Sequence, residues 1–512
     1  MIRKIPVHLV LIPAYFVVAL FAQNISEVFV EDITRPLLIV TAVALLGLGI
    51  FSIFTRNIRR NALIVSTAFF FFFLYGLVYG VLKETVPTLA RHRFLLPLFL
   101  VALGLIWWGF GRAKSDFSRL TMLFNLFGII LLLMPMLNIF FFLRAQSSPR
   151  EELIENSSTV GTVVVNVDLP DVYYIIPDAY GRADQLLQDY GFDNTQFLDW
   201  LRAQGFYVVD CARSSYAHTM LTLPSLMQMD YVEEFASPEQ YYDGGTNDYI
   251  VHNVVRDQFE GIGYKVISFE DVHWDYQDAD VFYEFEFNLT SPYLRPFESI
   301  LVMNSMLRAL VEFNQQTQDL FSQQLYSPVK EHYLRQKFIL DTLEDEVIQM
   351  EGPKFVFAHV ETPHGPFVFN EDGTFIEEDA YYRGKYFSAI TAEYGNAGYI
   401  KQVQFMNNRL QEIIGKIMLE SNGEAAIIIQ ADHSNDEFGE PAQRMKILYA
   451  VYLPGQDYQQ YYPTTNSVNT FRLVFNALFD MDYEILEDHS YHSYRSDRYN
   501  WVEVAENAPL CR

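Results

Sequence analysis

The sequence has very little cysteine: only Cys211 and Cys511 occur among 512 residues. Small disulfide-stapled scaffolds need several pairs, so that class of protein is excluded. A single bond between the two cysteines is compatible with a location outside the cytoplasm. The first apolar stretch also lacks a small-residue cleavage site, and further apolar stretches follow it. We therefore expect no cleavable signal peptide.

Basic residues are scarce in the larger part of the chain. Residues 1–150 contain 14 Lys and Arg against 5 Asp and Glu, a net charge of +9, which leaves 22 against 58, or −36, for residues 151–512. Proteins that bind nucleic acid need a basic surface, so we expect no nucleic acid partner. An anionic substrate remains compatible with the acidic part if a bound metal ion supplies positive charge locally.

Long apolar runs dominate the basic amino-terminal part. Each is close to the ~20 residues that a membrane-spanning helix requires, and they cover about 5–22, 36–55, 62–82, 93–110 and 120–143. The connecting segments on the amino-terminal side carry eight Lys and Arg, against six on the opposite side. This difference favours an amino terminus inside the cell. We expect residues 1–145 to form a five-span domain in the inner or plasma membrane, with the rest of the chain outside.

After a juxtamembrane linker at 146–165, strand-like and helix-like segments alternate through residues 166–512. Such alternation predicts an α/β domain with a mostly parallel central sheet. The expected strands are 172–176, 206–209, 265–269, 354–359, 425–429 and 447–453. The expected helices are 194–204, 299–313, 331–350, 392–420 and 468–478.

Polar residues follow the most apolar of these strands. Residues 425–429 form an unbroken apolar run, and Asp432 and His433 come directly after it. Ligand sites of open α/β sheets lie just beyond the carboxyl ends of the strands. A carboxylate beside an imidazole there suits one divalent cation. Taken alone, the pair also fits a loop aspartate bonded to a surface histidine.

Two other expected strands end in similar residues. Asp178 follows the strand at 172–176, with Arg182 shortly behind it, and the strand at 354–359 ends in His359 and is followed by His364 between two prolines. Prolines make the segment around His364 stiff, which suits a side chain held over a cleft. Individually, these residues also fit a turn, a helix cap or a packed loop.

A fourth candidate lies in the segment 214–227. Proline is best tolerated in the first turn of a helix, so Pro224 predicts a helix that starts near Thr222 and leaves Thr219 just before it. The positive end of such a helix provides a phosphate-binding environment around Thr219. An ordinary Ser/Thr capping segment is the alternative.

The order Asp178, Thr219, His364, Asp432-His433 resembles the alkaline-phosphatase and sulfatase superfamily. The resemblance is strongest to its membrane-anchored phosphotransferase branch, which includes lipoteichoic acid synthases and lipid A phosphoethanolamine transferases. It implies five spans followed by an alkaline-phosphatase-like catalytic domain. It also implies that Asp178, Thr219, Asp432 and His433 bind a divalent metal, zinc or manganese. Both named relatives have Glu in place of Asp178.

Within this resemblance, Thr219, Thr222 and Pro224 match the nucleophile motif of the phosphoethanolamine transferases, so Thr219 is the implied nucleophile. The sequence departs from the family at Ser434, where Gly is usual, and in having too few cysteines for the family's disulfides. No histidine occurs between Ser434 and Gly455, which implies one tightly held metal rather than two. The motif from which sulfatases make formylglycine is absent, so sulfate-ester hydrolysis is not expected.

Three functions are therefore considered. In the first, a lipid donor passes a phosphate-linked headgroup, through a phosphothreonine at Thr219, to an envelope glycan or lipid acceptor. Arg182, His359 and His364 are candidates for binding the phosphoryl oxygens. The second is a phosphodiesterase, phosphatase or other sulfatase-like hydrolase that uses the same residues with water as acceptor. The third is a metal-free membrane scaffold, against which the complete set of candidate residues argues.

Overall fold

The computed structural model describes residues 5–25, 30–86, 88–113, 115–146, 169–236, 246–271, 274, 276, 278–285, 294–314, 316–317, 328–377, 392–435, 441–494 and 497–504. The chain divides into two compact units. One contains Met1–Asn156 and Phe287–Pro328, and the other contains Ser157–Glu286 and Val329–Arg512. Most of the expected linker at 146–165 lies outside the described residues, and the domain boundaries expected from the sequence remain predictions.

Five apolar helices make up most of the first unit, at the five places where the sequence predicts spans. They are α1 (His8–Gln23), α2 (Thr34–Phe54), α3 (Ile58–Thr85), α4 (His92–Arg112) and α5 (Ser118–Gln146), with a short 3-10 turn η1 (Val30–Ile33) before α2. Four of them, α2 to α5, have the length and hydropathy to cross a membrane. Helix α1 has 16 residues and is shorter. The number of spans therefore remains a prediction.

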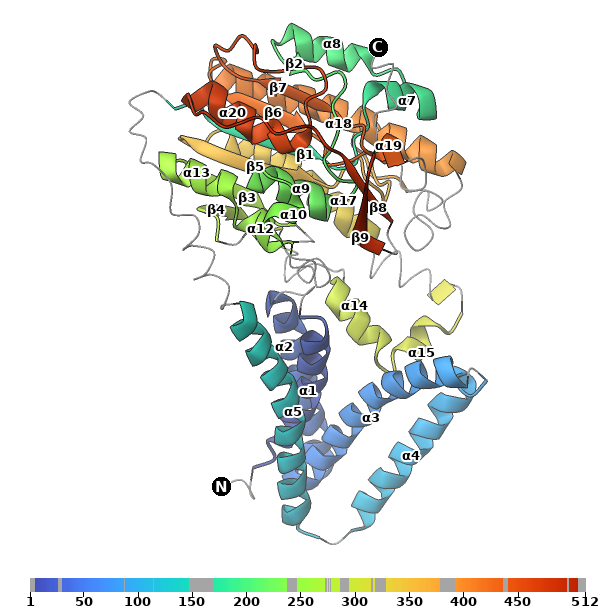
Figure 1. Ribbon diagram of the computed structural model, residues 1–512. Helices are drawn as coiled ribbons and strands as arrows, with labels where there is room; N and C mark the ends of the chain where they lie inside the picture. Colours follow the sequence, from blue (N-terminus) through green and yellow to red (C-terminus); the bar gives the residue numbers. More distant parts are fainter. Residues whose placement is uncertain are drawn as a thin grey trace. The chain divides into compact units, whose positions relative to one another are not determined.

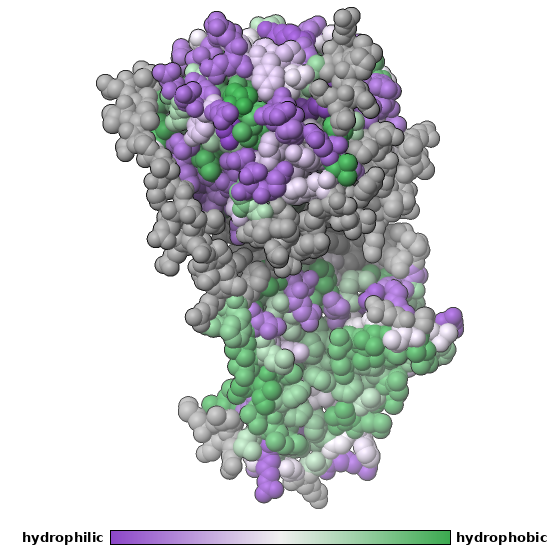
Figure 2. Space-filling model, in the orientation of Figure 1, coloured by the Kyte–Doolittle hydropathy of each residue, from purple (hydrophilic) through white to green (hydrophobic). Residues whose placement is uncertain are grey.

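The surface of this unit is suited to lipid. Only 11% of the apolar window of α2 and 6% of that of α4 is buried, and large apolar side chains such as Leu46 and Leu98 are exposed. Figure 2 shows the apolar residues gathered over these helices. Exposed apolar surface of this extent marks an interaction with another apolar phase, so this unit is the membrane part of the protein.

The second unit is built on a seven-stranded sheet with the order β2-β7-β6-β1-β5-β3-β4 (Figure 1). The strands are β1 (Val172–Pro177), β2 (Tyr207–Val208), β3 (Lys265–Phe269), β4 (Val281–Tyr283), β5 (Lys354–Val360), β6 (Ala426–Gln430) and β7 (Tyr449–Tyr452). All neighbouring strands from β6 to β4 are parallel, and β7 is antiparallel to β6 and β2. The sequence-based prediction of a mostly parallel α/β sheet is confirmed.

Helices cover both faces of this sheet. The described helices of this unit are α7 (Ala183–Tyr190), α8 (Thr195–Ala203), α9 (Thr219–Gln228), α10 (Val232–Phe235), α12 (Asp248–Val251), α13 (Val254–Ile262), α17 (Pro328–Thr342), α18 (Ala392–Glu420), α19 (Pro441–Arg444) and α20 (Thr470–Phe479). On one face, Phe259 of α13 and Phe471 of α20 pack against Phe355 of β5. Every residue of β1, β5 and β6 is buried. Strands with both faces covered need continuous apolar runs, which is why these three were visible in the sequence.

The described residues also contain elements that the sequence did not reveal. Strand β4 is short, and β8 (Tyr491–Tyr494) and β9 (Asp497–Glu503) form a separate polar hairpin. The helix expected at 299–313 is wrong as a single element of the outer domain. It is two short helices, α14 (Pro296–Met303) and α15 (Arg308–Val311), and both belong to the membrane unit. The chain breaks between them because the Met306 N–H bonds the Phe72 carbonyl of α3 instead of continuing the helix.

Candidate functional site

The candidate residues meet at the carboxyl edge of the three central strands. In the parallel register, Ile176 of β1 lies opposite His359 of β5, and Ile175 lies opposite Ile429 of β6. Asp178 therefore emerges beside His359, and Asp432 emerges two residues past the end of β6. Because parallel strands end at the same edge, residues more than 250 positions apart in the chain come together here.

Thr219 approaches this edge from the amino-terminal end of α9. Its hydroxyl donates to Asp432 Oδ2 at 2.6 Å and lies 3.2 Å from His433 Nε2. Thr219 is the first residue of α9, with His218 in extended conformation before it. The first N–H groups of a helix have no partner within the helix. Thr219 thus lies where an anion would be favoured.

The predicted start of this helix near Thr222 is wrong by three residues, and Pro224 lies inside α9. The first turn closes before the proline, because the N–H groups of Leu221 and Thr222 both donate to the His218 carbonyl. The hydroxyl of Thr222 donates to the Tyr216 carbonyl at 2.8 Å. These bonds fix the segment that presents Thr219.

The buried Asp178, His359 and Asp432 form a metal-type cluster, in which one donor atom from each lies within 4.8 Å of the others. His433 Nε2 is 3.6 Å from Asp178 Oδ1 and 3.4 Å from Asp432 Oδ2. Sequence reasoning placed His359 with the substrate-binding residues, whereas its position is beside the two carboxylates. The signal available in the sequence was that His359 ends its predicted strand, just as Asp178 closely follows another.

Two atoms of this cluster need a partner. Asp178 Oδ1 and His359 Nε2 are buried and make no hydrogen bond. Leaving buried polar atoms unpaired is costly, and a divalent cation would satisfy both. On the other side of the ring, His359 Nδ1 lies 2.7 Å from Asp271 Oδ2. A carboxylate can only accept there, so Nδ1 carries a proton, and Nε2 is the ring atom that could bind a metal ion. The donor set therefore fits zinc or manganese.

The pKa values reflect a buried site with competing charges. Burial raises the pKa of Asp178 well above its usual range, and the Asp432 carboxylate raises it further. Burial also opposes ionisation of Asp432, but His433, His359 and the Thr219 hydroxyl outweigh it and lower the pKa of Asp432 overall. Burial lowers the pKa of His433 to about 3, although Asp432 acts in the opposite direction. Neighbouring buried carboxylates of this kind favour a bound positive charge.

His364 is held close to the cluster by its backbone. Its N–H donates to the Asp178 carbonyl at 3.0 Å, and the buried Gln402 side chain donates to the carbonyls of Pro363 and His364. The rings of His364 and His433 have their centres 6.1 Å apart. Burial lowers the pKa of His364, which favours its neutral form. A neutral imidazole can both donate and accept a hydrogen bond.

The arginine chosen from the sequence has another partner. The Arg182 guanidinium is bound by Asp184 at 2.6 and 2.9 Å and by the Ala212 carbonyl. Sequence reasoning missed Arg444 at the end of α19, a buried residue whose Nη2 lies 3.5 Å from His433 Nε2. Nothing in the sequence around Arg444 marks it. It reaches the site because the Ser434 N–H bonds the Arg444 carbonyl at 2.9 Å and joins the two segments.

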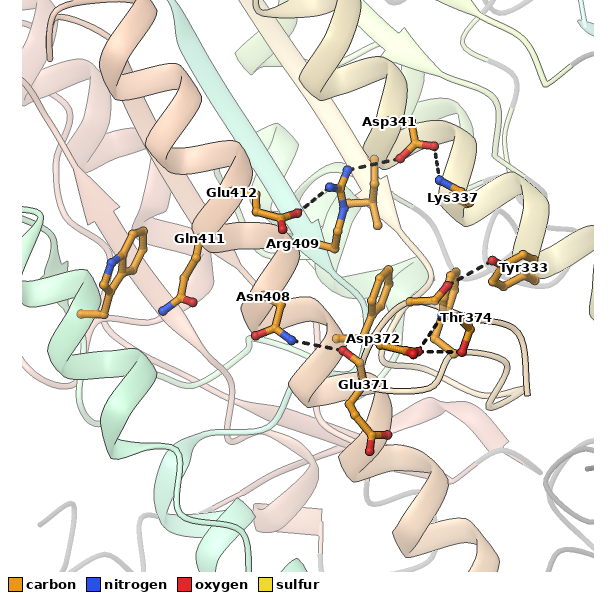
Figure 3. Close-up of a pocket in the computed structure, with 15 residues that line it drawn as sticks. Tyr333, Lys337, Asp341, Glu371, Asp372, Thr374, Asn408, Arg409, Gln411 and Glu412 are labelled. Carbon is orange, nitrogen blue, oxygen red and sulfur yellow. Dashed lines mark hydrogen bonds and ion pairs between the residues drawn. The ribbon is translucent and has the colours of Figure 1, made fainter. Parts of the chain in front are cut away.

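A pocket of about 830 Å³ opens elsewhere in the same unit, between α17, α18 and the loop around Asp372 (Figure 3). Its polar side chains largely bind one another: Arg409 pairs with Asp341 and Glu412, and Asn408 donates to the Glu371 carbonyl. None of the metal-type cluster lines this pocket. The candidate site is therefore the strand-end cluster and not this cavity.

No family model and no curated protein matches the chain. Similar solved structures include the periplasmic domain of EptC from Escherichia coli in complex with Zn, with 11% identity and a TM-score of 0.40 over 66% of this chain and 93% of that one. Lipoteichoic acid synthase LtaP from Listeria monocytogenes has 15% identity and a TM-score of 0.36 over 60% and 72% of the two chains. The integral membrane lipooligosaccharide phosphoethanolamine transferase EptA from Neisseria meningitidis has 12% identity and a TM-score of 0.37 over 93% and 95%. The chain is thus similar to the solved structures of EptC, LtaP and EptA. At these identities and TM-scores, its activity has to be inferred from its own residues.

Proposed function

We propose that the protein is a membrane-anchored, metal-dependent phosphotransferase with Thr219 as nucleophile. The observation that carries this proposal is the contact of the Thr219 hydroxyl with both Asp432 (2.6 Å) and His433 (3.2 Å), beside two further buried ligand-type side chains. A structural threonine at a helix start would not need two carboxylates and two histidines around it. A hydroxyl that must be activated as a nucleophile would need such groups around it.

Asp178, His359, Asp432 and His433 would hold the metal ion, with Thr219 Oγ1 beside them. The bound ion supplies Lewis acidity, which lowers the pKa of a coordinated hydroxyl or water from about 15.7 towards about 7. The chain's own contribution begins with Asp432, whose depressed pKa keeps it ionised as the acceptor of the Thr219 hydrogen bond. That bond aims the Thr219 oxygen at the phosphate that α9 favours at its amino-terminal end.

Transfer then takes two displacements at phosphorus. In the first, a bond forms between Thr219 Oγ1 and phosphorus, the bond from phosphorus to the donor's alcohol oxygen breaks, and the proton that Thr219 gives up leaves on the alcohol. In the second, an acceptor hydroxyl attacks phosphorus, the bond from phosphorus to Thr219 Oγ1 breaks, and the acceptor's proton returns to Thr219. His364 and Arg444 lie close enough to the cluster to bind phosphoryl oxygens. Catalysis of phosphoryl transfer comes mainly from positioning the transferred group and stabilising the charge on these oxygens.

The apolar helices of the first unit support a lipid donor, because a lipid-linked headgroup is available only at a membrane. We propose that the catalytic unit lies on the outer side of an inner or plasma membrane, and that the acceptor is an envelope glycan or lipid. Hydrolysis is the second candidate. It would need only that water replaces the acceptor hydroxyl in the second displacement, and the same residues would serve.

Intact-protein mass spectrometry tests the proposal. Purified protein is incubated with a phospholipid extract and quenched in acid, and a mass increase equal to a phosphate-linked headgroup is expected on Thr219. The Thr219→Ala variant should show no increase and a turnover at least ~10³-fold lower. Thr195→Ala serves as the matched control, since Thr195 is likewise the first residue of a helix, α8, and its side chain is exposed. Full turnover by Thr219→Ala would refute the nucleophile. Products compared with and without a glycan acceptor distinguish transfer from hydrolysis.

A further inference from the structure

Two short helices that belong to the sequence of the outer domain fold with the membrane helices instead. Helices α14 and α15 lie between β4 and α17 in the chain, yet they pack on the membrane unit (Figure 1). Phe297 of α14 is 2% exposed, in a cluster with Val17, Val40 and Phe73. Ala309 of α15 is buried with Tyr75 and other residues of α3 and α4. Each of the two helices therefore contributes a side chain to a buried cluster that it shares with the membrane helices.

Two ion pairs, the first of them largely buried, fix the start of this segment. Arg35 of α2 binds Glu298 through two bonds of 2.6 and 2.5 Å, and the two side chains are 14% and 5% exposed. Arg295 binds Asp32 at 3.1 Å. A forked arginine–carboxylate pair is geometrically specific, and breaking a buried pair leaves an uncompensated charge. These contacts hold α14 in one place.

The turn between the two helices rests directly on the backbone of α3. The Met306 N–H donates to the Phe72 carbonyl at 2.8 Å. A Cβ atom added to Gly76 would lie 2.2 Å from the backbone of Asn304. Only glycine leaves room for such a close approach of two main chains. Gly80, one turn later in α3, has nothing within 4 Å of the same position and gives a natural comparison.

The polar groups at the far end of the segment are gathered against α3 and α4. Glu312 lies 2.8 Å from each of Tyr79 Oη, His92 Nε2 and Arg308 Nε. The Arg308 guanidinium lies 4.4 Å above the Tyr79 ring. The charged groups of α15 are thus satisfied within the unit.

What the segment presents outward is apolar. Leu307 is 40% exposed, Leu310 62% and Phe313 76%. Other large apolar side chains of the same unit are exposed too, such as Leu77 of α3, the helix on which the segment rests. An apolar face of this kind, whose neighbours are membrane helices, fits one partner, the lipid bilayer.

We propose that residues 294–314 are a membrane-inserted anchor, in which Leu310 and Phe313 enter the apolar phase of the bilayer while the Arg35–Glu298 pair and the Gly76 contact hold the segment on the membrane helices. The anchor gives the outer domain a second attachment to the membrane. The chain crosses between the two units three times, after residues 156, 286 and 328, so the catalytic unit is tied through three connections. This function does not depend on the activity proposed for Thr219.

Site-directed spin labelling of the full chain in phospholipid nanodiscs tests the anchor. A nitroxide is attached to Phe313→Cys or Leu310→Cys without reductant, so that Cys211 stays disulfide-bonded, and the unsubstituted protein should take up no label. Collision rates with oxygen and with a water-soluble nickel chelate give the depth. We expect the collision rates at 310 and 313 to match those of a label at Leu98→Cys on α4, where Leu98 is 64% exposed. Because a polar chelate is excluded from an apolar phase, nickel contact at both positions should be at least ~5-fold lower than at Leu419→Cys on α18, where Leu419 is 73% exposed.

The contact with α3 is tested by the two glycines. In Gly76→Leu the side chain displaces the Asn304 backbone, so nickel contact at position 313 should rise towards the Leu419 value. In Gly80→Leu it should stay unchanged. Labels at 310 and 313 that read as aqueous in the unsubstituted background would overturn the anchor. An equal response to the two glycine substitutions would overturn the docking that holds it.

Discussion

Asp271→Asn is the substitution that examines the proposed metal centre most directly, because Asp271 touches a ligand but not the ion. Its Oδ2 lies 2.7 Å from His359 Nδ1, and both side chains are about 4% or less exposed. The carboxylate fixes the tautomer and raises the basicity of the opposite nitrogen. An asparagine has the same shape, so the ring stays in position. It lacks the charge, so Nε2 becomes a weaker ligand.

Loss of such a supporting carboxylate typically weakens metal binding 10–100-fold, which is about 1.4–2.7 kcal/mol. We expect this loss for Asp271→Asn, and a larger one for His359→Gln. Protein stripped with a chelator is titrated with Zn²⁺ against a fluorescent competitor chelator. Asp341→Asn is the control, since Asp341 pairs with Lys337 and Arg409 away from the cluster. At saturating metal, Asp271→Asn should recover most of its turnover.

Unchanged Zn²⁺ affinity in both Asp271→Asn and His359→Gln would show that His359 is not a ligand. The ligand set would then be the one that the sequence alone suggested, namely Asp178, Thr219, Asp432 and His433. Unchanged affinity in Asp271→Asn with a loss in His359→Gln would instead refute the role of Asp271 in orienting the ring. Either result can be read without knowing the donor lipid.

Further predictions concern stability. Asp171→Ala leaves the Lys354 ammonium, whose side chain is 1% exposed, without its carboxylate partner. The free energy of unfolding of the outer unit, measured by urea titration, should therefore fall by about 3–5 kcal/mol. Most of this loss should be recovered in the Asp171→Ala/Lys354→Met double variant. Burial lowers the pKa of His332 to about 4 in the folded protein. As the pH falls, the unfolded state therefore takes up a proton at a higher pH than the folded state does, and up to about 3 kcal/mol of stability should be lost between pH 6.5 and 4. His332→Gln should lack this loss, and an identical pH profile would refute it. Removal of metal by chelator should lower the melting temperature of the outer unit, and Zn²⁺ at about 100 times its Kd should restore about 2.7 kcal/mol; no shift would argue against a resident ion.

The sequence by itself determined the local features of this protein. Apolar runs long enough to cross a bilayer predicted the five helices, because helix length in a membrane is set by its thickness. Apolar runs containing β-branched residues predicted β1 and β6 to within one residue, because strands covered on both faces are mostly apolar. The segment after each of these strands was then the natural place to look for Asp178 and Asp432.

The tertiary structure decided what depends on contacts between distant segments. The parallel register sets His359 beside Asp178, and the joining of residues 434 and 444 brings Arg444 to His433, while Arg182 is bound by Asp184. The start of α9 was decided by bonds to His218 and Tyr216, against the preference of Pro224 for a first turn. The membrane location of residues 294–314 was equally hidden, because only packing on α3 reveals that helices of ordinary composition belong to the membrane unit. Pattern and propensity act over a few residues, whereas partners of this kind are chosen by the closed fold.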